Sequence, residues 1–116
     1  MGMDLSGRGG YAYFNWFTWG RCLTVALAFG WEPAGTVSPD LSGLGIGVDE
    51  EDIYPNWDGS YFSNDHQQVT DLDARSLSLA LGRALAAVAT GQIVIAEQAK
   101  VRELADFAAH GGFTIA

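Results

Sequence analysis

Apolar residues recur at helical spacing in three parts of the chain, and these parts define the expected architecture. The first predicted helix runs from about Trp16 to Phe29, with Asn15 as its N-cap and Gly30 just after its end. Apolar residues occupy nearly every face of this helix, so the pattern predicts a central and buried position.

Two further helices are predicted in the second half of the chain. One begins after the N-cap Thr70, where Asp71 and Asp73 complement the helix dipole, and it ends at Gly91. The other runs from about Ala96 to His110. The apolar stripe of the helix that begins after Thr70 consists of Leu72, Leu77, Ala80, Leu81, Ala84, Leu85 and Val88. We expect the two stripes to pack together, with Leu81, Leu85, Leu104 and Phe107 at the contact.

The middle of the chain, residues 34–69, has no helical period, and short strands are expected there. The predicted strands are Gly35–Val37, Leu44–Val48 and Ser60–Ser63, and a last strand at Phe113–Ile115 is expected to pair with this middle segment. The Gly-rich residues 1–13 are expected to be irregular. The prediction is one α+β domain over residues 1–116, mainly helical, with three principal helices and a small sheet or hairpin from the middle segment.

The negative charge is concentrated in one part of the sequence. The net charge is −8, and ten of the fourteen acids lie between Arg21 and Arg75, an interval without Lys or Arg. Such a block repels nucleic acid and anionic membranes, since phosphate contact requires basic side chains. Two interpretations of the block remain: it attracts a cation or a basic protein, or it is a solvated surface that maintains solubility.

Cysteine content and hydropathy bear on the compartment. Cys22 is the single cysteine, so no intrachain disulfide forms, and this fits the reducing cytoplasm. The apolar stretch 11–31 contains Arg21 and several polar residues, and it is too weakly hydrophobic for a membrane span. We therefore expect a cytoplasmic protein without a membrane partner.

Neither a cofactor nor a metal site is predicted. The glycines Gly43, Gly45 and Gly47 match no phosphate-binding pattern, and four acids follow them directly. Read as a calcium loop, the segment 58–73 has unsuitable residues at required positions, namely Phe62, His66 and Gln67. No catalytic residue is assigned either.

Two functional interpretations remain open. The favoured one is a non-enzymatic protein that binds a basic partner through an acidic segment with interspersed aromatic residues. Its predicted contact residues are Asp49, Glu50, Glu51, Asp52, Trp57, Asp58 and Tyr61. The alternative is a small enzyme or ligand-binding domain whose pocket is lined by Trp57, Asp65 and His66. A pocket with converging carboxylates at His66 would favour the alternative. For Phe62 we expect a packing role over the helices.

Four short segments together resemble a loose group of uncharacterised bacterial proteins. They are Met-Gly-Met-Asp at residues 1–4, Gly-Trp-Glu-Pro-Ala-Gly-Thr at 30–36, Tyr-Phe-Ser-Asn-Asp at 61–65 and Gly-Gly-Phe-Thr-Ile at 111–115. The resemblance implies no activity. In that group a Gly follows Ser-Asn-Asp, whereas this chain has His66, which argues against a tight turn at this position.

Overall fold

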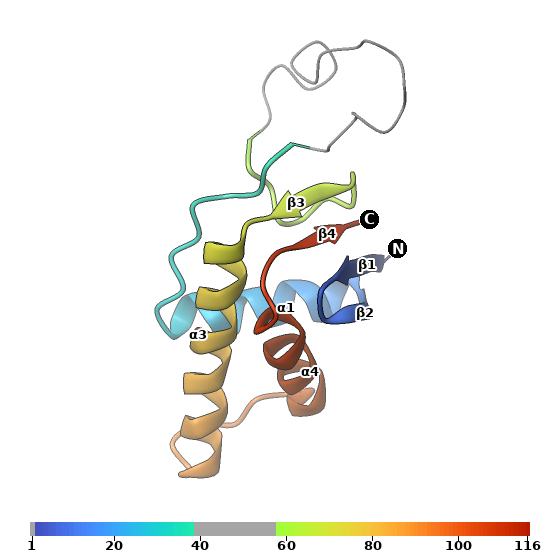
Figure 1. Ribbon diagram of the computed structural model, residues 1–116. Helices are drawn as coiled ribbons and strands as arrows, with labels where there is room; N and C mark the ends of the chain where they lie inside the picture. Colours follow the sequence, from blue (N-terminus) through green and yellow to red (C-terminus); the bar gives the residue numbers. More distant parts are fainter. Residues whose placement is uncertain (1, 39–57) are drawn as a thin grey trace, which may run out of the picture.

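The computed structural model of the protein describes residues 2–38 and 58–116. Within these ranges, three helices and a four-stranded antiparallel sheet form an α+β fold in which helix predominates, as the sequence predicts. The elements in chain order are β1 (Gly2–Gly7), β2 (Gly10–Asn15), α1 (Trp16–Ala28), β3 (Gln67–Val69), α3 (Asp71–Ala89), α4 (Gln98–Ala108) and β4 (Phe113–Ile115) (Figure 1). In the described part of the chain, no helix combines the length and apolar composition that crossing a bilayer requires.

The N-terminal segment forms a β-hairpin, so the prediction of irregular backbone over residues 1–13 is wrong. Met3 and Leu5 of β1 are buried, as are Ala12 and Phe14 of β2, whereas the intervening side chains are more exposed. This is the two-residue period of a half-buried strand, here concealed by frequent glycines. Gly10 has a φ of 97°, a backbone conformation that glycine adopts without steric cost.

The strand order of the sheet is β2-β1-β4-β3, so the predicted strand Phe113–Ile115 lies between the hairpin and β3. The middle segment contributes only β3 to the named strands. Of the strands predicted there, Gly35–Val37 supplies a single bridge from Val37 to Gln68, and Ser60–Ser63 forms bends and irregular backbone. The predicted strand Leu44–Val48 lies outside the described residues.

A buried glutamine explains why β3 has no recognisable apolar pattern. Gln67 is fully buried, and its side-chain Nε2 donates to the backbone oxygens of Ser60 and Ser63. Its Oε1 accepts from the backbone N–H of Asp65 at 2.8 Å. The amide thus satisfies the polar groups of the preceding bends, and this makes a polar residue acceptable in the core.

Helix α1 has the predicted N-cap, because the side chain of Asn15 accepts from the backbone N–H of Thr18 at 2.8 Å. The buried face of this helix includes Trp19, Cys22 and Leu23. On the opposite face Trp16 and Phe17 are 56% and 64% exposed in the described structure. The prediction of a central and buried helix therefore holds for one face of α1 and is wrong for the other.

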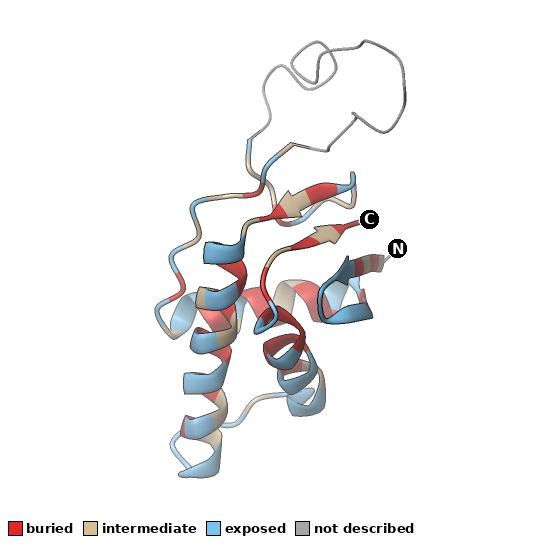
Figure 2. Cartoon of the chain, viewed as in Figure 1, coloured by how far each residue is buried: buried red, intermediate tan, exposed pale blue. Residues whose placement is uncertain are grey.

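Helices α3 and α4 pack against each other as predicted, and buried positions gather where the two helices face one another (Figure 2). Leu81, Leu104 and Phe107 are buried, and Leu85 is partly buried against the same core. Thr70 caps α3 by accepting from the backbone N–H of Asp73. Leu72, which the apolar stripe includes, is 75% exposed, although Asp73 and Ala74 in the same turn are buried, so Leu72 belongs to the outer face of α3.

Asp73 holds together the two ends of the segment that precedes β3. It is a buried carboxylate whose oxygens accept from the backbone N–H groups of Ala34 and Gly35, each at 3.0 Å, and from the hydroxyl of Tyr61. The backbone N–H of Thr36 also donates to the carbonyl of Gly59 at 3.1 Å. The segments 34–36 and 59–61 therefore lie side by side.

Candidate functional site

The residues predicted to bind a basic partner are only partly within the described structure. Asp49, Glu50, Glu51, Asp52 and Trp57 lie outside the described residues. Asp58 is exposed, and its Oδ1 accepts from the backbone N–H of Ser60 at 3.0 Å.

Tyr61 is not exposed, which corrects its assignment as a contact residue. It is buried, and its ring packs edge-on against Trp31 with ring centroids 5.0 Å apart. Burial, together with the hydrogen bond to Asp73, raises the pKa of the Tyr61 phenol. Its role in the described structure is to join the loop before β3 to α3.

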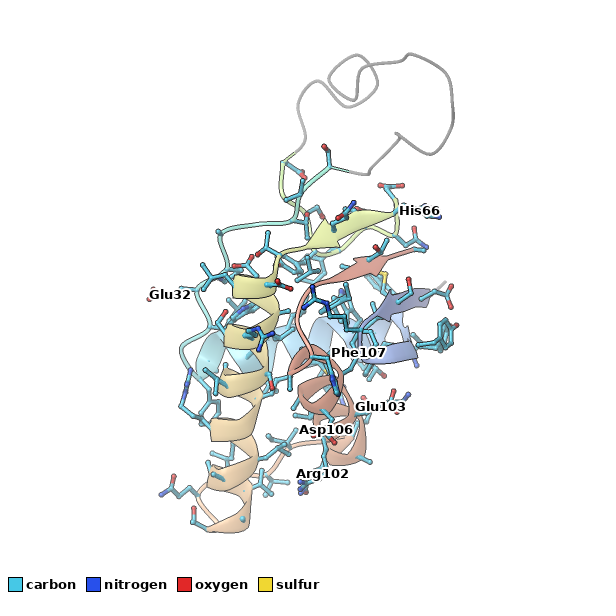
Figure 3. All side chains as sticks on the ribbon, in the orientation of Figure 1. Glu32, His66, Arg102, Glu103, Asp106 and Phe107 are labelled. Atoms are coloured by element: carbon cyan, nitrogen blue, oxygen red, sulfur yellow. The ribbon has the colours of Figure 1, made fainter. Side chains whose placement is uncertain are left out.

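Asp65 and His66, proposed for the alternative pocket, form the turn before β3 and are both exposed. Figure 3 shows His66 at the outer end of this turn. The backbone of His66 has a φ of 68°, a left-handed conformation that favours glycine, although glycine is absent here. The backbone N–H of His66 donates to Ile115 at 2.8 Å, which fixes the turn to β4.

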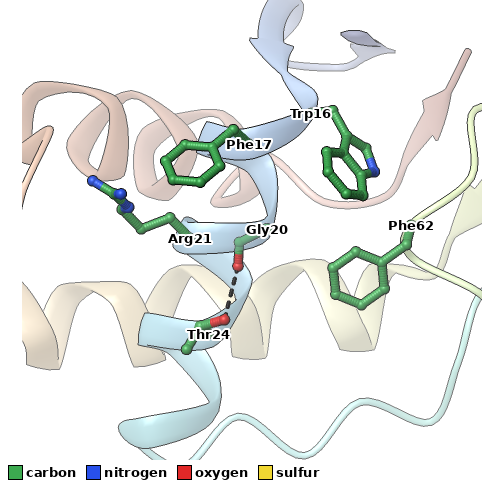
Figure 4. Close-up of a pocket in the computed structure, with 6 residues that line it drawn as sticks. All are labelled: Trp16, Phe17, Gly20, Arg21, Thr24 and Phe62. Atoms are coloured by element: carbon green, nitrogen blue, oxygen red, sulfur yellow. Dashed lines mark hydrogen bonds between the residues drawn. The ribbon is translucent and has the colours of Figure 1, made fainter. Parts of the chain in front are cut away.

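Three exposed aromatic side chains, Trp16, Phe17 and Phe62, lie together on the described surface and are here named the α1 aromatic face. The side chain of Phe62 is 53% exposed, and its ring lies over Gly20, so it covers α1 in part, as expected. With Gly20, Arg21 and Thr24, the three rings line a surface hollow of about 500 Å³ (Figure 4). A hollow of this size accommodates several side chains or a small molecule.

Gly20 forms the floor of this hollow. It lies in the middle of α1, where glycine is less stable than alanine by about 0.5–1 kcal/mol. A methyl group at this position would meet only the Phe62 ring within 4 Å, at 3.8 Å, so packing does not forbid alanine. The glycine lowers helix stability and keeps open the space between Trp16 and Phe62.

Arg21 lies beside the hollow, and its charge is balanced by neighbouring groups. The guanidinium carbon is 4.6 Å from the centroid of the Phe17 ring, and Nη1 is 3.8 Å from Oε2 of Glu97. Both carboxylate oxygens of Glu97 accept from the hydroxyl of Thr18 at 3.2 Å. These contacts fix Arg21 along α1 and leave the wall formed by Trp16 and Phe62 apolar.

Glu97 also has an unusual backbone conformation. It occupies the N-cap position of α4 with a φ of 58°, and its side chain makes no cap hydrogen bond to that helix. The carboxylate reaches α1 instead and lines a second hollow, of about 670 Å³, with Asn15, Trp16, Phe17 and Thr18. The two hollows share Trp16 and Phe17, so these two side chains form a ridge between them.

Other reactive groups of the described structure do not assemble into a catalytic arrangement. Cys22 is buried, and burial raises the pKa of its thiol to about 11, which keeps it protonated at neutral pH. The hydroxyl of Tyr11 donates to Asp4 on the open face of the sheet, and this hydrogen bond raises the pKa of the Tyr11 phenol. Among the described residues, no group of three or more His, Cys, Asp or Glu side chains is arranged to hold a metal ion.

Comparisons with known proteins give no match: no family model, no curated protein and no solved structure is significantly similar to this chain.

Sequence reasoning did not assign the α1 aromatic face, although its residues are visible in the chain. A helix that is apolar on all sides, in a chain with only 116 residues, has two explanations. It is either central in the core or exposes a face for contact with another molecule. Gly20 in the middle of that helix is the local feature that favours the second explanation, since a buried face is expected to be filled with side chains.

Proposed function

We propose that this protein is a non-enzymatic binding protein of the cytoplasm whose partner is a basic protein. The observation that carries the proposal is the combination of an exposed aromatic face on α1 with a long acidic interval that lacks Lys and Arg. Exposed Trp and Phe side chains dominate the energetics of many protein contacts, and opposite charges accelerate association.

The acidic residues and the α1 aromatic face are linked along the chain. Asp58 and Asp65 are both exposed and lie four residues before and three residues after Phe62. Four residues span at most about 14 Å even when fully extended, which limits how far these two residues lie from Phe62. In this proposal Asp49, Glu50, Glu51 and Asp52 add long-range attraction, and the aromatic side chains supply the close contact.

The alternative, an enzyme or ligand-binding domain with a pocket at Trp57, Asp65 and His66, receives less support. Asp65 and His66 are exposed, and neither lines the two hollows at α1. The cytoplasmic part of the proposal is supported by the free thiol of Cys22 and by the absence of any second cysteine from the sequence.

The proposal is tested by capture from a native lysate at low and high salt, with identification by mass spectrometry. The test variant replaces Asp49, Glu50, Glu51 and Asp52 by Asn and Gln. The control replaces Glu103 by Gln and Asp106 by Asn, two exposed acids on α4 (Figure 3). We expect the wild type and the control to retain basic proteins that the test variant loses, and high salt to release them. If the wild type, the test variant and the control capture the same set of proteins, the proposal is contradicted.

A further inference from the structure

We infer that the hollow above Gly20 receives a large apolar side chain from a short basic segment of the partner, seated between Trp16 and Phe62. This inference rests on the proposed function and names the part of the partner that makes the close contact. Its basis is the geometry of the hollow and the distribution of charge around it.

The shape of the hollow favours an apolar side chain. Trp16 and Phe62 lie on the same side of Gly20, with open space between their rings (Figure 4). The hydroxyl of Thr24 donates to the backbone oxygen of Gly20 at 2.9 Å, so this polar group already has a partner inside the helix. Arg21 is engaged with Phe17 and Glu97. An entering apolar group therefore displaces water from the rings without breaking a strong polar contact.

The charges around the hollow favour basic residues beside that apolar group. Asp58 and Asp65 flank Phe62 in the sequence and are exposed, and the charge of Arg21 is balanced by Glu97. Asp58 and Asp65 lie within four residues of Phe62 in the sequence, so a basic segment that contacts the Phe62 ring meets opposite charge on both sides of that residue along the chain.

Charge also argues against a second copy of the chain as the occupant. Each copy has a net charge of −8, and ten of its acids lie in the interval that contains Phe62. Docking of two copies would bring together two chains that each have this net charge, and like charges oppose association. The same charge opposes docking on an anionic membrane.

The experiment is a selection from a random peptide library displayed on phage, with the full chain as the target. We expect enriched peptides to contain several Lys or Arg residues and at least one large apolar residue. Their affinities are then measured by isothermal calorimetry for the wild type and for single variants. Trp16→Ala and Phe62→Ala are expected to weaken binding about thirty-fold each, the loss typical of an interface anchor.

Gly20→Ala provides the most specific variant, because it places a methyl group on the floor of the hollow without a close clash. We expect it to weaken binding several-fold while the melting temperature rises. Gly82→Ala is the matched control, since Gly82 also lies inside a helix and an added methyl group there meets nothing within 4 Å. It is expected to raise the melting temperature equally and leave binding unchanged. Leu79→Ala controls for an exposed apolar residue outside the hollow, at 66% exposure.

The outcomes separate this inference from the proposed function. If basic peptides bind Trp16→Ala, Phe62→Ala and Gly20→Ala as tightly as they bind the wild type, the inference is overturned and the proposed function stays intact. Enrichment of peptides without basic residues overturns both. Concentration-dependent dimerisation abolished by Trp16→Ala, or binding to phosphatidylcholine vesicles abolished by the same change, overturns the inference in favour of a second copy or a lipid surface.

Discussion

The hydroxyl of Tyr61 donates a hydrogen bond of 2.6 Å to Oδ2 of Asp73, and both side chains are buried. Asp73 belongs to the first turn of α3, whereas Tyr61 lies in the loop before β3. This bond therefore connects that loop to the helix. The other contacts of the carboxylate are backbone N–H groups of Ala34 and Gly35. One buried acid therefore organises three separate parts of the chain.

Removing the hydroxyl of Tyr61 is expected to destabilise the fold. Tyr61→Phe leaves the ring packed on Trp31 but takes one donor from a buried carboxylate, and it should cost about 1.5–3 kcal/mol in urea denaturation. Tyr11→Phe is the control, because its hydroxyl also meets an acid, Asp4, but at an exposed site. A loss below about 0.5 kcal/mol for Tyr61→Phe would show that the bond does not stabilise the structure.

His66 offers a test of backbone strain. Because its φ is 68°, His66→Gly is expected to leave the free energy of unfolding unchanged or raise it by up to about 1 kcal/mol. His66→Val should lower it by about 1–2 kcal/mol, since a β-branched residue fits this conformation poorly. Chemical denaturation of the three proteins is sufficient. Equal stability of the Gly and Val variants would contradict a left-handed turn at this position.

Asp71 is expected to make the stability of the protein depend on pH. The backbone N–H of Gly112 donates to its Oδ1 at 2.6 Å, and this hydrogen bond lowers the pKa of the carboxyl. A pKa that is lower in the folded state stabilises the fold above the unfolded pKa of about 3.9, and this contribution disappears as the pH falls through the folded value. The melting temperature of wild type should therefore exceed that of Asp71→Asn at neutral pH, and the difference should shrink below about pH 4. A constant difference across this range would exclude the ionised carboxylate as the cause.

The contact between α3 and α4 is expected to show graded sensitivity to truncation. Leu104 is fully buried, so Leu104→Ala should cost about 2–5 kcal/mol. Leu85 is only partly buried, and Leu85→Ala should cost less than about 2 kcal/mol. Guanidinium titration of both variants checks this order, and the reverse order would mean that the helices pack in a different register.

Local rules were sufficient for the three helices, because their starts and apolar stripes depend on neighbouring residues. Asn15 and Thr70 both cap as expected, and each bond is made within three residues. The hairpin of β1 and β2 was missed because its glycines hide a two-residue period, and β3 was missed because Gln67 is buried through contacts made by its side chain.

The candidate site was less accessible to sequence reasoning, as Tyr61 and Phe62 illustrate. The two aromatic residues are adjacent, yet one is buried and the other is 53% exposed. Which of them faces inward depends on Asp73, twelve residues further along the chain, and on Trp31. Local patterning contains no information about contacts of this range, so the predicted site included Tyr61 where the exposed ring belongs to Phe62.

The close approach of Gly35 and Gly59 joins two points of the chain that lie far apart in the sequence. A Cβ atom at Gly59 would lie 3.2 Å from the Cα of Gly35. The carbonyl of Gly59 also accepts a hydrogen bond from the backbone N–H of Thr36, the residue after Gly35. The entropy of closing a loop changes by only about 0.6 kcal/mol when its length doubles. A change in the length of the connection between Val37 and Asp58 is therefore expected to add little loop-closure entropy, whereas Thr36, which is buried, and Val37, which bridges to Gln68, belong to the scaffold. Under the proposed function, such a change offers a way to alter the preference for a partner.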